Sequence, residues 1–321
     1  MSENCTPLVE KAEISFAMLG MVDGNGHPYS WSAIINGYDQ EEMAKCPYAT
    51  IPNYLGKEPK ETLRIPNARV THIWTDDPAN ACHIAKATFI PHVVQSPEDV
   101  IGEVDAVIIP TDKGYEHVER CRAFIEAGLP VFVDKPLVDN EKDLITFRSW
   151  ITERKPILSS SCMRYCKEYL PYRLSTNVLG KLRFVSITTA KSWERYGIHA
   201  LEGVYPILGK GFISARNTGT IDRNIVHFKH QSGADVIVVA INDMYGSSGV
   251  LELCGTAGHA EVTSSDTYYT FKSQLEAYIK FLRTGLSSFP FSETEELMKM
   301  LIAGMRSRDE GGREVMLSEI G

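Results

Sequence analysis

The fold is decided by the stretch DAVIIPTDKGYEHVERCRAFIEAGLPVFVDKP, residues 105–136. The apolar run at 105–110 predicts a strand, and the apolar spacing over 115–127 predicts an amphipathic helix that Gly128 ends. A second apolar run at 130–136 predicts another strand. Strand, helix and strand in this order indicate a βαβ unit with two parallel strands.

Further patterns extend this unit into a Rossmann-type parallel sheet. Short apolar runs predict strands at 14–19 and 69–74, and another helix is expected to begin near Asn140. The segment 38–68 is rich in proline, glycine and charge, and we interpret it as an insertion in the first crossover.

From about residue 180, turn residues separate short strand-like runs, which favours a large, mostly antiparallel, open-faced sheet. These runs lie at 181–190, 224–230, 235–242, 249–255 and 259–264. Two amphipathic helices follow, at 271–285 and 292–311. The prediction is an α/β protein with an N-terminal Rossmann domain at 1–138 and a C-terminal α+β domain at 139–321.

Length and composition limit the function classes. A chain of 321 residues exceeds what one core usually fills, so two domains are expected. The net charge of -8 and the scattered basic residues argue against a nucleic-acid partner. No apolar run approaches the roughly 20 residues of a membrane helix, and the N-terminus lacks the pattern of a secretory signal.

Seven dispersed cysteines do not form a disulfide framework, which favours a reducing cytoplasm. Cys162 and Cys166 are spaced C-x3-C, but no second pair completes a zinc site. We therefore expect inert thiols here and no metal site.

The stretch AMLGMVDGNGHP, residues 17–28, follows the first predicted strand. In a parallel-sheet domain, the pyrophosphate of a dinucleotide meets the first helix at this place. The spacing is not G-x-G-x-x-G, and Pro28 predicts that the helix starts near Tyr29 or Ser30. The residues expected to bind the cofactor at this turn are Gly20, Val22, Gly24, Asn25 and Gly26.

An acidic residue that binds the ribose hydroxyls normally follows the glycines by about 20 positions. The insertion moves it to Asp76 or Asp77, and we select Asp76. Because a carboxylate repels a 2′-phosphate, NAD is favoured over NADP. Taken alone, these features fit a glycine-rich surface turn and a solvated aspartate pair equally well.

Four segments carry a resemblance to a known family: 104–138 with its Asp134-Lys135-Pro136 motif, 163–187, 251–262 and 271–317. Over most of its length apart from the insertion, the chain resembles the Gfo/Idh/MocA family of nicotinamide-dependent oxidoreductases, also called the glucose-fructose oxidoreductase and inositol dehydrogenase family. The resemblance implies a Rossmann domain followed by an open antiparallel sheet, with the substrate between them. It also implies a homodimer or homotetramer formed through the C-terminal sheet.

The resemblance implies two catalytic residues. The lysine of the family motif lies near the nicotinamide and the reacting hydroxyl, and this role falls to Lys135. A cation there favours a developing alkoxide. The segment RYGIHALE at 195–202 retains the family histidine as His199. Its neutral imidazole can take the hydroxyl proton.

One position departs from the family pattern, because Arg195 stands where an aspartate is common. The adjacent Tyr196 and Glu194 are candidates to take over its role. Glu202 either binds substrate or caps local structure, and the aromatic residues nearby either stack on a sugar ring or pack in the core. The predicted substrate-binding residues are Lys135, Arg164, Trp193, Tyr196, His199 and Glu202, and further cofactor-binding residues are Thr111, His117, Asp134 and Lys135.

Together these features predict a cytoplasmic NAD-dependent oxidoreductase. It would oxidise or reduce a secondary alcohol of a sugar, a sugar derivative or a cyclitol by hydride transfer. Two alternatives stay open. One is a regulatory protein that binds a dinucleotide or a sugar without turnover. The other is an enzyme that uses tightly bound NAD for transient oxidation during elimination, hydrolysis or epimerisation.

Overall fold

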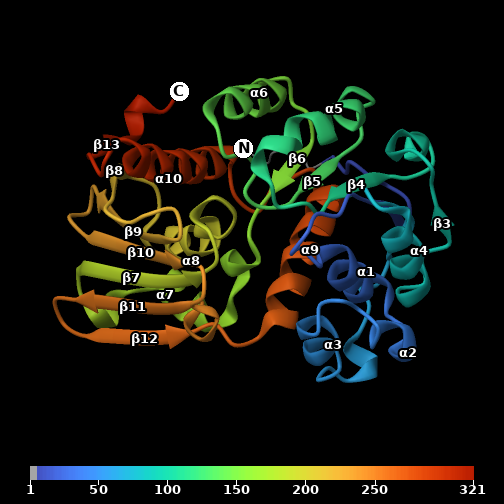
Figure 1. Cartoon of the computed structure of the whole chain (residues 1–321), viewed down its shortest axis with the longest axis horizontal. Coiled ribbons are helices and arrows are strands. Elements are labelled where there is room, and N and C mark those ends of the chain that lie inside the picture. The colour runs from blue at the N-terminus through green and yellow to red at the C-terminus, as the bar shows by residue number, and fades with distance from the viewer. Residues whose placement is uncertain (1–5) are drawn as a thin grey trace.

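The computed structural model describes residues 6–321, which form two sheets and the helices packed on them (Figure 1). The first sheet is parallel, with the strand order β3-β2-β1-β4-β5-β6. Its strands are β1 (Ile14–Leu19), β2 (Ala68–Trp74), β3 (His92–Val93), β4 (Ala106–Ile109), β5 (Val131–Val133) and β6 (Ile157–Ser159). The strand order reverses between β1 and β4, and ligands of such sheets bind at the carboxyl ends of the strands at this point. The predicted Rossmann-type sheet is confirmed.

The helices predicted near residue 29, at 115–127 and near residue 140 are present around this sheet, and the other helices there were not predicted. In chain order, the helices are α1 (His27–Asn36), α2 (Gln40–Met43), α3 (Thr50–Leu55), α4 (Pro78–Ala87), α5 (His117–Glu126) and α6 (Glu141–Thr152). Helix α1 starts at His27, two or three residues earlier than predicted, with Pro28 in its first turn. Asn140 caps α6, because its side chain accepts the N–H of Asp143.

Side chains of β1 alternate between two cores, as the period of a strand requires. Phe16 and Met18 belong to a core with α1, α4 and α9 (Thr267–Thr284). Ala17 and Leu19 belong to a core with α5 and α6, which continues into the second sheet. Helix α9, from the far end of the chain, therefore covers one face of the first sheet (Figure 1).

The second sheet has the strand order β12-β11-β7-β10-β9-β8-β13, and only its β7–β10 pair is parallel within the described residues. Its strands are β7 (Leu182–Ala190), β8 (Phe212–Asn217), β9 (Arg223–His230), β10 (Asp235–Ile241), β11 (Val250–Gly255), β12 (His259–Thr263) and β13 (Val315–Met316). The remaining helices are α7 (Leu170–Leu174), α8 (Ile198–Leu208) and α10 (Phe291–Asp309). Alternate residues of β9 and β10 are buried, so one face of this sheet carries the core. The mostly antiparallel sheet is confirmed.

Strand β6 pairs with β5, so the parallel sheet runs past residue 138 to Ser159. The precise division between the two domains stays a prediction. Among the helices of residues 6–321, none combines the length and the apolarity that crossing a bilayer requires.

Candidate active site

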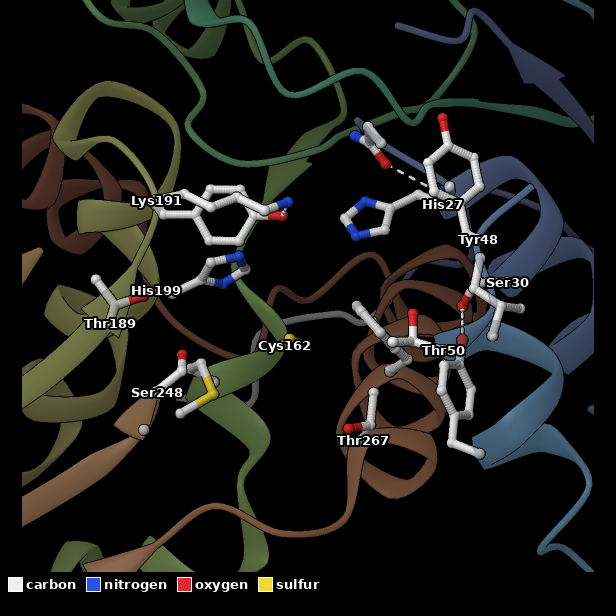
Figure 2. Close-up of a pocket in the computed structure, with 18 of the residues that line it drawn as sticks. His27, Ser30, Tyr48, Thr50, Cys162, Thr189, Lys191, His199, Ser248 and Thr267 are labelled. Atoms are coloured by element: carbon white, nitrogen blue, oxygen red, sulfur yellow. Dashed lines mark hydrogen bonds between the residues drawn. The ribbon is translucent and has the colours of Figure 1, made fainter. Parts of the chain in front are cut away.

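A cavity of about 550 Å³ opens between the glycine turn of the first domain and the second sheet (Figure 2). This volume is typical of sites for small molecules. The first domain contributes the turn, α1 and the predicted insertion, and the second contributes the end of β7 and the start of α8. The insertion residues on its wall are Tyr48, Thr50, Ile51, Asn53, Tyr54 and Lys57. Figure 2 shows Lys191 and His199 facing His27 across the cavity.

His199 lies in the first turn of α8, after a π-helical turn at Trp193–Gly197. Such turns are frequent at functional sites. Its Nδ1 atom is 2.7 Å from Ser161 Oγ. Burial lowers the pKa of His199 well below its ordinary value, and the positive charge of Lys135 lowers it further. The imidazole is therefore neutral at neutral pH and able to accept a proton.

Lys135 lies beneath the cavity and does not line it. Its side chain is only 2% exposed, its Nζ atom is 3.5 Å from Asp112 Oδ2, and the ammonium lies 4.7 Å from the centre of the Tyr196 ring. Burial disfavours the ammonium, but the carboxylates of Asp134 and Asp112 outweigh this and raise the pKa of Lys135. The ring centroids of Tyr196 and His199 are 4.9 Å apart, so Lys135 and His199 approach the same tyrosine.

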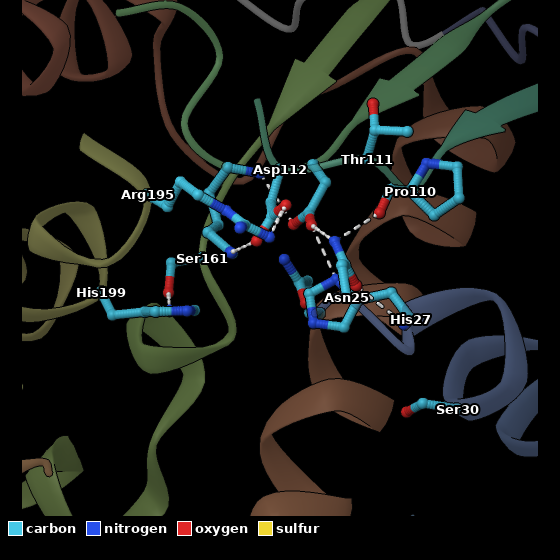
Figure 3. Close-up of polar contacts among 12 residues, drawn as sticks. Asn25, His27, Ser30, Pro110, Thr111, Asp112, Ser161, Arg195 and His199 are labelled. Atoms are coloured by element: carbon cyan, nitrogen blue, oxygen red, sulfur yellow. Dashed lines mark hydrogen bonds and ion pairs between the residues drawn. The ribbon is translucent and has the colours of Figure 1, made fainter. Parts of the chain in front are cut away.

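Arg195 reaches from the second domain to the first (Figure 3). Its guanidinium donates to Asp112 Oδ1 at 2.6 Å and to the carbonyl oxygen of Asp23 at 3.1 Å. Burial alone would raise the pKa of Asp112, but Lys135 and Arg195 hold it well below its ordinary value. The residue that replaces the family's common aspartate is thus paired with an aspartate of the other domain.

His27 is a site residue that the sequence reasoning missed. Its Nδ1 atom is 2.6 Å from Asp134 Oδ2, and its ring stacks on Trp31 with centroids 4.5 Å apart. Asp134 is fully buried and also accepts the N–H of Lys135, so its oxygens are used within the protein. With Nδ1 bonded to the carboxylate, Nε2 is the nitrogen of His27 available to a ligand. The sequence feature that could have identified His27 is its position directly before Pro28, in the glycine turn.

The predicted turn residues surround the carboxyl end of β1. Gly20 has φ of 105°, and a Cβ atom there would come within 2.9 Å of the Thr111 methyl group, so the position requires glycine.

Asp76 lies at the end of β2, accepts the N–H of Met21 and pairs with Arg120 at 2.8 Å. Gly26 packs under the insertion, whose Tyr48 and Ile51 side chains would contact any Cβ atom. The other predicted turn residues are Val22, Gly24 and Asn25; Gly24 and Asn25 line the cavity.

His117, a predicted cofactor residue, is fully buried, and burial lowers its pKa. Its Nδ1 atom is 3.0 Å from the Leu137 carbonyl oxygen, and its Nε2 atom is 2.9 Å from the Thr111 carbonyl oxygen and 3.1 Å from Thr111 Oγ1. These bonds tie the loop after β4 to the loop after β5. The position fits a role in holding these loops rather than a contact with a ligand.

Three of the predicted substrate residues lie behind the cavity wall. Trp193 is fully buried and donates its indole N–H to the Leu301 carbonyl oxygen at 2.9 Å. Arg164 forms a buried ion pair with Glu202, and Glu202 accepts the N–H of Ser161 at 3.1 Å. Because Ser161 bonds to His199, this pair positions the histidine, whereas Tyr196 and His199 themselves line the cavity.

Fold and cavity together define a protein with a Rossmann-type sheet, a second, mostly antiparallel sheet and a cavity lined by residues from both halves of the chain. Residues 51–158 match a family model described as "Oxidoreductase family, NAD-binding Rossmann fold", that of the Gfo/Idh/MocA family. An inositol 2-dehydrogenase of Rhodococcus erythropolis (strain PR4 / NBRC 100887) is 34% identical over 126 residues, which cover 37% of this chain and 36% of that protein. The predicted resemblance to the Gfo/Idh/MocA family is thus confirmed over residues 51–158.

Solved structures share the fold over nearly the whole chain. A probable dehydrogenase from Thermotoga maritima superposes with a TM-score of 0.75 at 14% identity, covering 96% of this chain and 100% of that one. The scyllo-inositol dehydrogenase from Lactobacillus casei, with bound NAD(H) and scyllo-inositol, superposes with a TM-score of 0.74 at 12% identity. The superposition covers 95% of this chain and 99% of that one. At these identities the likeness concerns the fold.

Proposed function

We propose that this protein is an NAD-dependent oxidoreductase that acts on a secondary alcohol of a cyclitol, a sugar or a sugar derivative. The observation that carries the proposal is the neutral His199, held by Ser161 at a cavity beside the glycine turn. An imidazole in this state can accept the proton of a hydroxyl group. The inositol dehydrogenase among the relatives supports an alcohol as the reacting group.

The first domain fits the dinucleotide. Asp76 presents a partly exposed carboxylate at the end of β2, suited to ribose hydroxyls and repulsive to a 2′-phosphate. Within residues 6–321, the N–H groups of Val22, Asp23 and Gly26 donate to no protein acceptor, so they are available to the pyrophosphate. NAD would supply the nicotinamide carbon that exchanges hydride with the substrate.

The chain's own residues then divide the remaining tasks. His199 takes or returns the hydroxyl proton at its Nε2 atom, because Nδ1 is bonded to Ser161. Lys135 acts through space, and its buried charge favours negative charge developing on the alcohol oxygen. Hydroxyl groups of Ser30, Thr189 and Ser248 line the cavity and can bind the remaining hydroxyls of a polyol.

A substrate screen tests this function. Purified protein is incubated with NAD or NADP and a panel of cyclitols and sugars, and both nicotinamide reduction and product mass are recorded. We expect reduction with NAD that His199→Gln abolishes. Binding without any product would instead support a regulatory protein, and product without net reduction would support an enzyme that recycles its cofactor.

Location and assembly remain part of the proposal. The six cysteines within residues 6–321 are free thiols, which suits a reducing cytoplasm. We place self-association, as a dimer or tetramer, at the face of the second sheet that carries the partly exposed Ile225, Ile237 and Val239.

A further inference from the structure

The cavity has an unusual balance of charge. The chain carries a net charge of -8, yet the charged residues that line the cavity are Lys57 and Lys191. In the part of the chain that the structure describes, no aspartate or glutamate lines it. The site is thus opposite in sign to the protein around it.

Two buried carboxylates beneath the cavity are already neutralised. Asp112 is bonded to Arg195 and lies next to Lys135, and Asp134 is bonded to His27. Both carboxylates are fully buried. Neither is therefore free to balance the lysines on the cavity wall.

Lys191 is held in place by the fold. It follows β7 with φ of 63°, a left-handed conformation that is uncommon for residues other than glycine and is concentrated at functional sites. This conformation places Nζ 2.5 Å from Tyr196 Oη, 4.2 Å from the centre of the Tyr196 ring and 3.5 Å from the Gly24 carbonyl oxygen. All of these partners are neutral, and Lys191 pairs with no carboxylate of residues 6–321.

Lys191 and Tyr196 together form an arrangement of donors. An ammonium has three N–H groups, so at least one remains for a ligand after the bonds to Tyr196 and Gly24. Tyr196 accepts from Lys191 and keeps its own O–H for donation. An N–H and an O–H side by side match two oxygens of an anionic group, and charge-assisted bonds of this kind are the strong ones.

We propose that the substrate alcohol carries an anionic group, which Lys191 and Tyr196 bind, with Lys57 attracting it at the rim formed by the insertion. This inference rests on the proposed function and narrows its substrate to acidic polyols, such as sugar acids or sugar phosphates. The cation on the wall selects them over neutral cyclitols.

Binding measurements separate this proposal from the catalytic one. Calorimetric titration with glucuronate, glucose 6-phosphate, glucose and myo-inositol, in the presence of NADH, measures binding without turnover, because the reduced cofactor cannot oxidise an alcohol. We expect at least one of the two anionic ligands to bind about 10- to 100-fold more tightly than glucose, the range of a charge-assisted hydrogen bond. Their relative affinities identify the carboxylate or the phosphate as the preferred group, and this binding should weaken as salt rises.

Variants locate the effect. Lys191→Met should remove the preference for the anionic ligand and leave the affinity for NAD unchanged. Lys191→Arg keeps the positive charge and should therefore keep most of the preference for the anionic ligand. Lys45→Met is the matched control, because that exposed lysine pairs with Glu42 outside the cavity. The proposal is overturned if neutral ligands bind as well as anionic ones, or if Lys191→Met weakens NAD alone, which would assign Lys191 to the cofactor. If the wild-type protein binds the anionic ligands more tightly than glucose but oxidises none of the ligands, only the proposed function is overturned.

Discussion

The charges beneath the cavity and those on its wall are arranged in opposite ways. Beneath it, Asp112 is matched by Lys135 and Arg195, and Asp134 by His27. On the wall, Lys191 contacts only neutral oxygens and a ring within the described residues. Charges matched within the protein hold groups in place, whereas an unmatched charge is available to a ligand.

A second matched set lies behind His199. Arg164 pairs with Glu202 and, at 2.8 Å, with Glu293, and it packs over the Phe289 ring. Through Ser161 this set fixes the orientation of the imidazole. The residues proposed to contact the substrate are therefore distinct from the residues that hold those side chains in position.

The largest effect is expected at the group that meets the reacting hydroxyl. Because His199→Gln removes the proton acceptor, kcat should fall about 10²- to 10⁴-fold, the usual contribution of a general base. Steady-state kinetics on the best substrate of the screen measures this. His92→Gln, on the exposed strand β3, is the control and should keep wild-type turnover. A loss smaller than about tenfold in His199→Gln would show that His199 is not the main proton acceptor.

The matched set behind His199 should control stability. Arg164→Met leaves the buried Glu202 unpaired and should lower the free energy of unfolding by about 3–5 kcal/mol. Arg122→Met breaks an exposed pair with Glu119 and should cost less than about 1 kcal/mol. Denaturant titration measures both, and equal losses would contradict the distinction between buried and exposed pairs.

A smaller effect is expected at the cofactor end. Asp76→Asn should raise the KM for NAD about tenfold or more, since a charged acceptor for the ribose hydroxyls is lost. The same change should reduce the preference of the enzyme for NAD over NADP. The neighbouring Asp77 accepts the N–H of Ala79 and caps α4. Asp77→Asn should therefore leave the KM for NAD unchanged. A cofactor effect that appears at Asp77 and not at Asp76 would reverse the assignment.

The smallest effect concerns pH. Because the pKa of His199 is lowered in the folded state, the unfolded chain binds the extra proton first as the pH falls below about 6.5. The free energy of unfolding should therefore drop between pH 6.5 and 5.5, by at most about 1 kcal/mol from this residue, and show no such change above that window. Denaturation of wild type and His199→Gln should reveal the difference, and identical pH dependences would show that His199 is not held neutral by the fold.

Much of the fold followed from local patterns. The strand at 14–19 matches β1, Asn140 caps α6, and Gly128 follows α5 with φ of 81°. The short strands β3 and β6 were missed, because two or three residues carry no detectable period. The packing of α9 on the first sheet was also missed, since its apolar face does not reveal which partner it covers.

For the site, the sequence by itself determined the kinds of group present: a glycine turn after β1, a carboxylate after β2, and Lys135 and His199 in recognisable motifs. Only the tertiary structure decided which of them meet. It paired His27 with Asp134, 107 positions away, and Arg195 with Asp112, 83 positions away, and it left Lys191 unmatched in the cavity. The physical reason is that spacing along the chain sets secondary structure, whereas the partner of a charge depends on which sheet edges and helix ends the topology brings together.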